Sequence, residues 1–165
     1  MAAPRRKPRR RPRPHTASRV AAVQALFQAE QGPENPETVI DQFVRHRLGE
    51  LPHAGGFEDG RVPDARVPLF ARIVRAAVRQ QDTIDRMLVE ALPQDWPLVR
   101  IDPVLRALLR AASAELVMAD GPPARAVINE YVDVARGFLE HTEAALANGV
   151  LDRIARLLRP AEFDA

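Results

Sequence analysis

Proline and glycine divide this 165-residue chain into seven apolar segments, and this division constrains the fold more than any other feature. Within each segment the apolar residues recur every three or four positions, which is the period of an amphipathic helix. No segment shows a convincing alternation of apolar and polar residues, which a half-buried strand would show. The sequence therefore predicts an all-α fold.

The same residues mark where the helices begin and end. Gly32-Pro33 and Gly121-Pro122-Pro123 should each stop a helix, and Asp102-Pro103 should start one, with Asp as the cap and Pro in the first helical position. Thr16 or Ser18 could cap the first helix. We expect helices at about residues 16–30, 36–48, 69–80, 82–92, 103–119, 124–139 and 142–158.

Residues 49–68 are rich in glycine and proline and are expected to form a long surface loop inside one helical domain that spans residues 16–160. Four aromatic side chains fall on apolar helical faces and are expected in the core. They are Phe27, Phe70, Tyr131 and Phe138.

Positive charge is concentrated at the N-terminus, where seven cations and no acid occur in the first 13 residues. Without these seven, the chain's 24 Lys and Arg fall to 17, against 22 Asp and Glu, so the body is net negative. Prolines at positions 4, 8, 12 and 14 favour a disordered arm over residues 1–15. An Arg-rich arm of this kind suits a polyanion, because each neutralised phosphate releases a counterion. A merely solubilising tail is the alternative.

The motifs of several other protein classes are missing. The chain has no cysteine, which excludes disulfides and thiol chemistry, and its four histidines lack metal-ligand spacing. It has no phosphate-loop, dinucleotide-binding or nucleophile-elbow motif. No apolar run approaches the roughly 18 residues of a membrane span. We therefore expect a cytoplasmic protein that is not an enzyme and uses no metal or cofactor.

Four segments together resemble the NusB family of bacterial transcription antitermination proteins. They follow the family's order and spacing and cover about residues 19–158. The segments are Arg19–Gln28, Trp96–Arg106, Pro123–Arg136 and Asn148–Asp152. The resemblance implies an all-helical fold of two packed three-helix bundles, without catalytic activity.

The resemblance also implies partners. Family members bind boxA-type RNA, pair with the ribosomal protein NusE, and load onto RNA polymerase to suppress termination at ribosomal RNA operons. Some family members self-associate, so the resemblance also allows a homodimer.

The family's RNA surface includes its basic N-terminus and first helix. Arg19 and Gln24 fall on matched positions, whereas the arm matches only in charge. Arginines would hold phosphates, and Gln24 would read base edges, unless it is simply a solvent-facing helix residue. Leu146 and Ala114 depart from the family, which usually has aromatics there. The expected RNA-binding residues are Arg5, Arg6, Lys7, Arg9, Arg10, Arg11, Arg13, Arg19 and Gln24.

Two other functions are consistent with parts of the sequence. One is a helical adaptor for proteins, in which RNA binding is incidental. The other is a stand-alone relative of the accessory domain of ribosomal-RNA cytosine methyltransferases. We expect the second less, because 165 residues leave no room for a Rossmann-like catalytic domain.

Overall fold

The computed structural model describes residues 13–48 and 65–164 of the chain. This part contains seven α-helices and one short 3₁₀ helix, so the all-α prediction is confirmed. The elements are α1 (Pro14–Gln31), α2 (Pro36–His46), α3 (Val67–Arg79), α4 (Gln81–Ala91), α5 (Pro103–Val117), α6 (Ala124–Phe138), α7 (His141–Leu158) and η2 (Pro160–Glu162).

The observed helix ends lie within two residues of the predicted ones. Helix α1 begins at Pro14, inside the expected arm, because proline fits the first helical position. Neither Thr16 nor Ser18 caps this helix. Helix α3 begins at Val67, so the last two residues of the predicted loop are helical. Residues 49–64 of that loop and residues 1–12 of the predicted arm lie outside the described residues.

Two side chains cap helices as their sequence context suggests. Asp102 Oδ1 accepts the backbone N–H of Val104 at 2.7 Å, which confirms the predicted start of α5. Asn35 Oδ1 accepts the N–H of Thr38 at 2.9 Å at the start of α2. Each bond satisfies an N–H that the first turn of a helix leaves without a partner.

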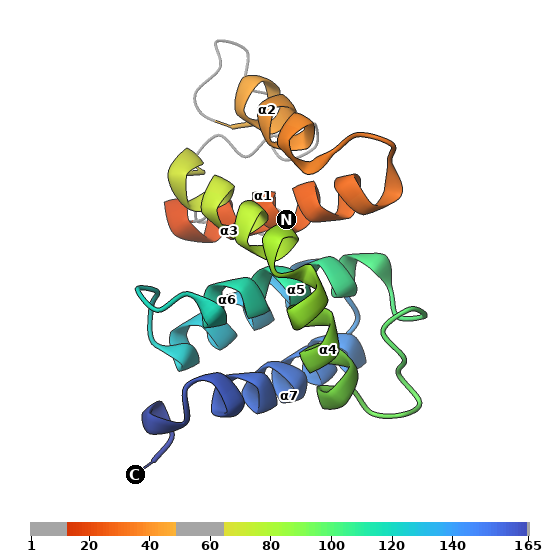
Figure 1. Ribbon diagram of the computed structural model, residues 1–165, viewed down its shortest axis with the longest axis vertical. Coiled ribbons are helices and arrows are strands. Elements are labelled where there is room, and N and C mark those ends of the chain that lie inside the picture. The colour runs from red at the N-terminus through yellow and green to blue at the C-terminus, as the bar shows by residue number, and fades with distance from the viewer. Residues whose placement is uncertain (1–12, 49–64, 165) are drawn as a thin grey trace, which may run out of the picture.

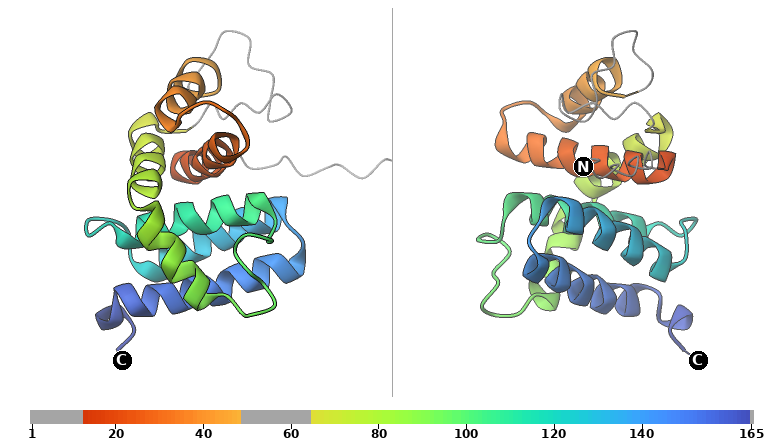
Figure 2. Two further views of the ribbon diagram at one scale, coloured as in Figure 1. Left: turned by 45° about the vertical axis from the view of Figure 1, so that its right-hand side comes forward. Right: turned by 180° about the vertical axis from the view of Figure 1, so that it is seen from behind.

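The helices form two groups, which Figures 1 and 2 show one above the other. Helices α1, α2 and α3 pack together in the first bundle. Helices α5, α6 and α7 form the second, where α4 joins them by packing against α5 and α7. The bundles meet mainly where α1 and α3 lie against α5.

The two central helices, α1 and α5, are each buried all round over part of their length. Burial is continuous from Ala17 to Val23 in α1 and from Ala111 to Leu116 in α5. Both helices are rich in alanine, whose small side chain permits close helix packing, and a helix buried all round needs no polar face. Helix α1 is thus part of the core of the whole molecule and also reaches its surface at both ends.

A buried ion pair joins the two central helices. Arg19 Nε donates to Glu115 Oε2 at 2.8 Å, and the two side chains are only 6% and 1% exposed. Burial lowers the pKa of Arg19, but the hydrogen bond and charge of Glu115 outweigh it, so the net pKa is raised and the guanidinium stays charged. Arg19 Nη1 also lies 3.5 Å from Glu130 of α6.

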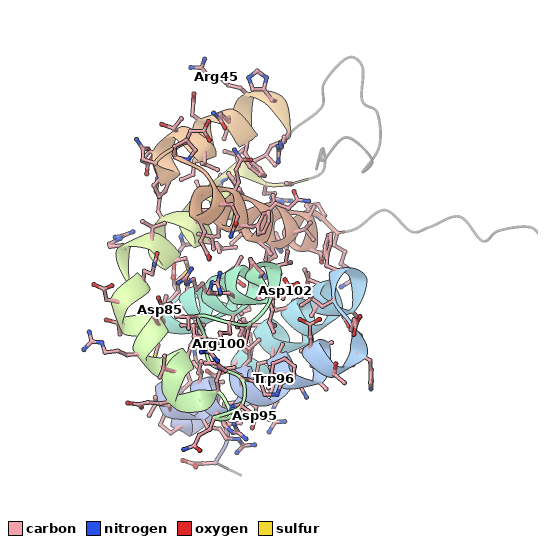
Figure 3. The ribbon with its side chains drawn as sticks, turned by 90° about the vertical axis from the view of Figure 1, so that its right-hand side faces the viewer. Arg45, Asp85, Asp95, Trp96, Arg100 and Asp102 are labelled. Atoms are coloured by element: carbon pink, nitrogen blue, oxygen red, sulfur yellow. The ribbon has the colours of Figure 1, made fainter. Side chains whose placement is uncertain are left out.

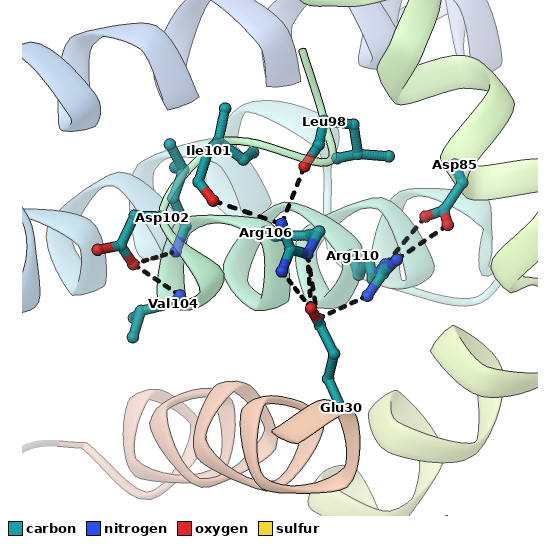
Figure 4. Close-up of polar contacts among 9 residues, drawn as sticks. Glu30, Asp85, Leu98, Ile101, Asp102, Val104, Arg106 and Arg110 are labelled. Atoms are coloured by element: carbon teal, nitrogen blue, oxygen red, sulfur yellow. Dashed lines mark hydrogen bonds and ion pairs between the residues drawn. The ribbon is translucent and has the colours of Figure 1, made fainter. Parts of the chain in front are cut away.

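A second ionic cluster closes the other end of the interface (Figure 4). Glu30, at the end of α1, accepts hydrogen bonds from Arg106 and from Arg110 Nη1, the latter at 2.9 Å. Arg110 also donates two bonds of 2.9 Å to Asp85 of α4. The cluster therefore connects α1, α4 and α5, and with the Arg19–Glu115 pair it brackets the contact between the bundles.

We predict that Arg19→Met destabilises the fold strongly, because it leaves the Glu115 carboxylate buried without its partner. The free energy of unfolding should fall by about 3–5 kcal/mol. The double variant Arg19→Met/Glu115→Leu should recover most of this loss, since no charge then remains buried. Urea unfolding followed by circular dichroism measures both changes.

The matched control is Arg45→Met, which breaks an exposed pair with Asp41 and should cost less than about 1 kcal/mol. Equal losses in Arg19→Met and Arg45→Met would contradict this role for the buried pair.

Candidate nucleic-acid and protein interface

A groove opens at the N-terminal start of α1, where the predicted arm joins the helix. Its volume is about 400 Å³. We call it the cationic groove, and it is lined by Arg13, Pro14, His15, Thr16, Arg19, Arg66, Pro122, Ala126 and Glu130. One wall comes from the starts of α1 and α3, and the other from the α5–α6 turn and from α6.

Two helix N-termini meet at this groove. Ser18 Oγ accepts the N–H of Arg66 at 2.7 Å and donates to the carbonyl oxygen of Pro14 at 2.8 Å, so the start of α3 is bonded to the start of α1. Neither helix has a side-chain cap. Their first-turn N–H groups carry partial positive charge, and such ends favour anions.

Two arginines add full charges to this wall. Arg13 and Arg66 are exposed, and neither forms an ion pair with a carboxylate of the described residues. Glu130, at 32% side-chain exposure, is the groove's acidic residue, and it is engaged by the hydroxyl of Thr16 at 2.8 Å. Among the described residues, therefore, no carboxylate competes with the oxygens of a phosphate for these two guanidinium groups.

Arg19 lines the cationic groove, but its side chain is only 6% exposed and its Nε donates to Glu115. Its predicted contact with RNA stays a prediction. Sequence similarity identified the position but not the carboxylate 96 residues away that occupies the side chain. Arg66, by contrast, was missed, because only the folded chain brings it beside the start of α1.

Of the arm's seven cations that are expected to bind RNA, Arg13 is the one in the described part of the chain. It precedes α1 directly and lines the cationic groove. The arm therefore enters the fold at this groove. The other expected RNA-binding residues of the arm lie outside the described residues, and their role stays a prediction: Arg5, Arg6, Lys7, Arg9, Arg10 and Arg11.

A second groove, mainly apolar, runs along the rest of α1. Its volume is about 510 Å³. We call it the apolar groove, and it is lined by Val20, Val23, Gln24, Phe27, Gln28, Gln31, Gly32, Arg47, Val104 and Phe138. The prediction that Phe138 packs in the core is wrong, since this side chain is 53% exposed. Phe70 and Tyr131 are fully buried, as predicted, and Phe27 is partly buried against the core.

Gln24 lies in the wall of the apolar groove. Its side-chain oxygen is buried and accepts no hydrogen bond from any residue that the structure describes. The residue is partly buried, so it is not the simple solvent-facing side chain that the sequence left as an alternative. An amide oxygen in this setting is suited to a donor supplied by a bound partner, because a buried acceptor without a bond is costly.

The connector between α4 and α5 carries the single tryptophan, Trp96. Figure 3 shows Asp95 and Trp96 at the opposite end of the molecule from Arg45 of α2. Trp96 is partly buried against the core, and the groove linings do not include it. We therefore do not include this single tryptophan in the candidate interface.

We also searched the described residues for a metal site and for a membrane-spanning helix. Residues 13–48 and 65–164 contain no group of three or more side chains that could hold a metal ion. Among the helices of these two ranges, none is long and apolar enough to span a membrane.

Comparisons with known proteins agree with each other. The model of the NusB family matches residues 16–156. A protein of Granulibacter bethesdensis named Transcription antitermination protein NusB is 66% identical over 150 residues, which cover 91% of this chain and 92% of that protein. A protein of the same name from Gluconobacter oxydans is 52% identical over 141 residues and covers 86% of each chain.

Solved structures show the same fold. NusB of T. maritima superposes with a TM-score of 0.71 at 25% identity, covering 92% of this chain and 98% of that one. The NusB chain in a crystal structure of NusB and NusE with double-stranded RNA superposes with a TM-score of 0.67 at 21% identity, covering 86% of this chain and 96% of that one. At that identity the second match shows the fold alone.

We predict that Phe138 contributes little to stability. Phe138→Ser should lower the free energy of unfolding by no more than about 1 kcal/mol, because the side chain is already half exposed. Phe70→Ser, a control in the core, should cost more than about 3 kcal/mol. Thermal and urea unfolding measure both. A large loss in Phe138→Ser would mean that this ring serves packing and is not a free surface.

Proposed function

The chain belongs to the NusB family of transcription antitermination proteins, and from this premise we propose that it binds boxA-type single-stranded RNA together with the ribosomal protein NusE. It is an antitermination factor and not an enzyme. One observation supports the two-partner proposal most directly. Helix α1 carries both a cationic groove at its start and an apolar groove along the rest of its length.

The RNA backbone would lie along the arm and the cationic groove. Arg13 and Arg66 are available to hold phosphates there, and the arm would add contacts through its six further cations. Such contacts supply affinity but no sequence choice. Choice would come from unstacked bases that reach beyond the cationic groove to Gln24, in the wall of the apolar groove, where RNA and NusE would then lie side by side. The buried oxygen of Gln24 accepts no hydrogen bond from the rest of the described chain.

The apolar groove would receive NusE. Its exposed ring, Phe138, and the partly buried ring of Phe27 offer apolar area, and glutamine amides surround them. Protein interfaces use an apolar centre with a polar rim in this way. The similar solved structure that contains NusB, NusE and RNA together supports this choice of partners.

The wider role follows from these two contacts. With NusE bound, the complex would load onto RNA polymerase and suppress termination at ribosomal RNA operons, in the cytoplasm. A second copy of the chain could instead cover the apolar groove, and such a homodimer would compete with NusE.

We predict that deleting residues 1–12 weakens boxA RNA binding and flattens its salt dependence. The deletion removes six cations and leaves Pro14 and the whole of α1 in place. The slope of log affinity against log salt should become shallower by up to about four, at about 0.7 per phosphate contact on single-stranded RNA. Fluorescence anisotropy across several salt concentrations measures the slope.

In this experiment the affinity of the chain should fall for boxA RNA and for scrambled RNA alike, since the arm would contact phosphates. An unchanged affinity and slope would show that the arm does not contact the RNA.

We predict that Phe138→Ser weakens NusE binding by at least about tenfold, the loss expected when an interface ring is truncated. Val89→Ser is the matched control, because Val89 is exposed on α4 and does not line the apolar groove. Calorimetric titration with purified NusE, with RNase present, gives both affinities. Sedimentation of the chain alone shows whether a second copy uses the groove.

Wild-type NusE affinity in Phe138→Ser would place NusE elsewhere. Retention of NusE without any preference for boxA over scrambled RNA would favour the adaptor function instead.

A further inference from the structure

Arg159 and Glu162, which follow α7, form hydrogen bonds to the turn between α5 and α6 and to the start of α6. Arg159, the residue after α7, donates from Nε to the carbonyl oxygen of Leu116 (3.0 Å) and from Nη1 to that of Pro122 (2.6 Å). Its Nη2 donates to the carbonyl oxygens of Glu115 (3.1 Å) and Met118 (2.8 Å). One guanidinium thus bonds three carbonyl groups at the C-terminus of α5, where positive charge is favourable, and a fourth, that of Pro122, just before α6.

All five N–H donors of Arg159 are used within the chain. The fifth points to Glu162 Oε2 at 3.4 Å, and the side chain is only 14% exposed. Arg159 therefore has no donor left for an external ligand. Its effect on binding must pass through the turn that it holds.

Glu162 holds the beginning of α6 by accepting a hydrogen bond from the backbone. Its Oε1 accepts the N–H of Ala124, the first residue of α6, at 3.0 Å. The guanidinium carbons of Arg125 and Arg156 lie 5.2 and 4.6 Å from the centre of the neighbouring Phe163 ring. These contacts anchor residues 159–163, which we call the C-terminal staple.

The first bundle holds the same turn from its other side. Arg72 of α3 donates to both carboxylate oxygens of Asp120, at 2.9 and 3.0 Å. This pair is exposed and contributes less than the staple does. Residues 118–123 are therefore supported by both bundles.

This turn forms one wall of the cationic groove. Pro122 and Ala126 line the groove together with Arg13 and Arg66, and Arg159 bonds directly to the carbonyl of Pro122. Ala126 lies two residues after Ala124, whose N–H is held by Glu162. The staple thus sets how far this wall stands from the arginines on the other side.

We infer that Arg159 and Glu162 are positioning residues for RNA binding, because they fix the groove wall that faces Arg13 and Arg66. The inference rests on the proposed function of the cationic groove. The residues touch no RNA. They keep the cationic groove at a width at which the phosphates of one RNA strand can contact both Arg13 and Arg66.

The test uses four single variants of the full chain that separate position from charge. Arg159→Lys keeps the charge but loses the planar fork, and Arg153→Lys is its control. Arg153 also lies near the end of the chain and bonds one carbonyl, that of Ala91, which is remote from the groove lining. Glu162→Ala removes the acceptor for Ala124, whereas Glu162→Gln removes the charge and keeps an acceptor.

Affinity for fluorescein-labelled boxA RNA is measured at a temperature where circular dichroism shows every variant folded. Arg159→Lys and Glu162→Ala should weaken binding about three- to tenfold, which is about half a decade to one decade in the dissociation constant. Arg153→Lys and Glu162→Gln should stay within about twofold of the unaltered chain. Hydrogen exchange at the amides of Met118, Gly121 and Ala124 should rise in the first pair only.

Three results would overturn the inference. Unaltered affinity in Arg159→Lys and Glu162→Ala, with the unaltered chain binding RNA, refutes the positioning role alone. Equal effects of Glu162→Ala and Glu162→Gln would assign the change to charge. No RNA binding by the unaltered chain would refute the proposed function and the positioning role with it.

Discussion

The close packing of α1 against α5 is the contact on which both bundles depend. Small alanine side chains let the two helices approach, and the Arg19–Glu115 pair crosses the buried surface between them. A buried ion pair contributes little net stability, because desolvation offsets the attraction, but each charge needs the other once both are buried. The pair therefore favours one arrangement of the bundles over others that would separate the two charges.

Glu115 also connects this interface to the end of the chain. Its carboxylate pairs with Arg19, while its backbone carbonyl accepts a bond from Arg159. The same stretch of α5 is thus held by α1 on one side and by the C-terminal staple on the other. Since Arg19 and Pro122 both line the cationic groove, the contacts that join the bundles also shape the proposed RNA surface.

The helices could be predicted from the sequence because proline, glycine and the apolar period are local signals. The Asp102-Pro103 start is one example, and its cap was observed. The side-chain roles were harder, because they depend on contacts between distant residues. Arg19 meets Glu115, Arg66 meets Ser18 across 48 positions, and Arg159 meets the α5–α6 turn across about 40. Phe138 was misplaced because the apolar period of α6 includes it, whereas at the last residue of the helix its side chain lines the open apolar groove.

The rigid start of α1 gives the arm a defined origin. Pro14 begins the helix and Ser18 bonds that first turn to the start of α3, so Arg13 enters from a fixed point at the cationic groove. A cationic segment tethered beside a groove meets a phosphate already bound there at an effective concentration of about millimolar, without any new contact on the body. The net negative body would limit phosphate contacts elsewhere, since carboxylates repel the RNA backbone. In the proposed function, the division of charge between arm and body would therefore direct RNA to one end of α1, next to the groove in which a protein partner would bind.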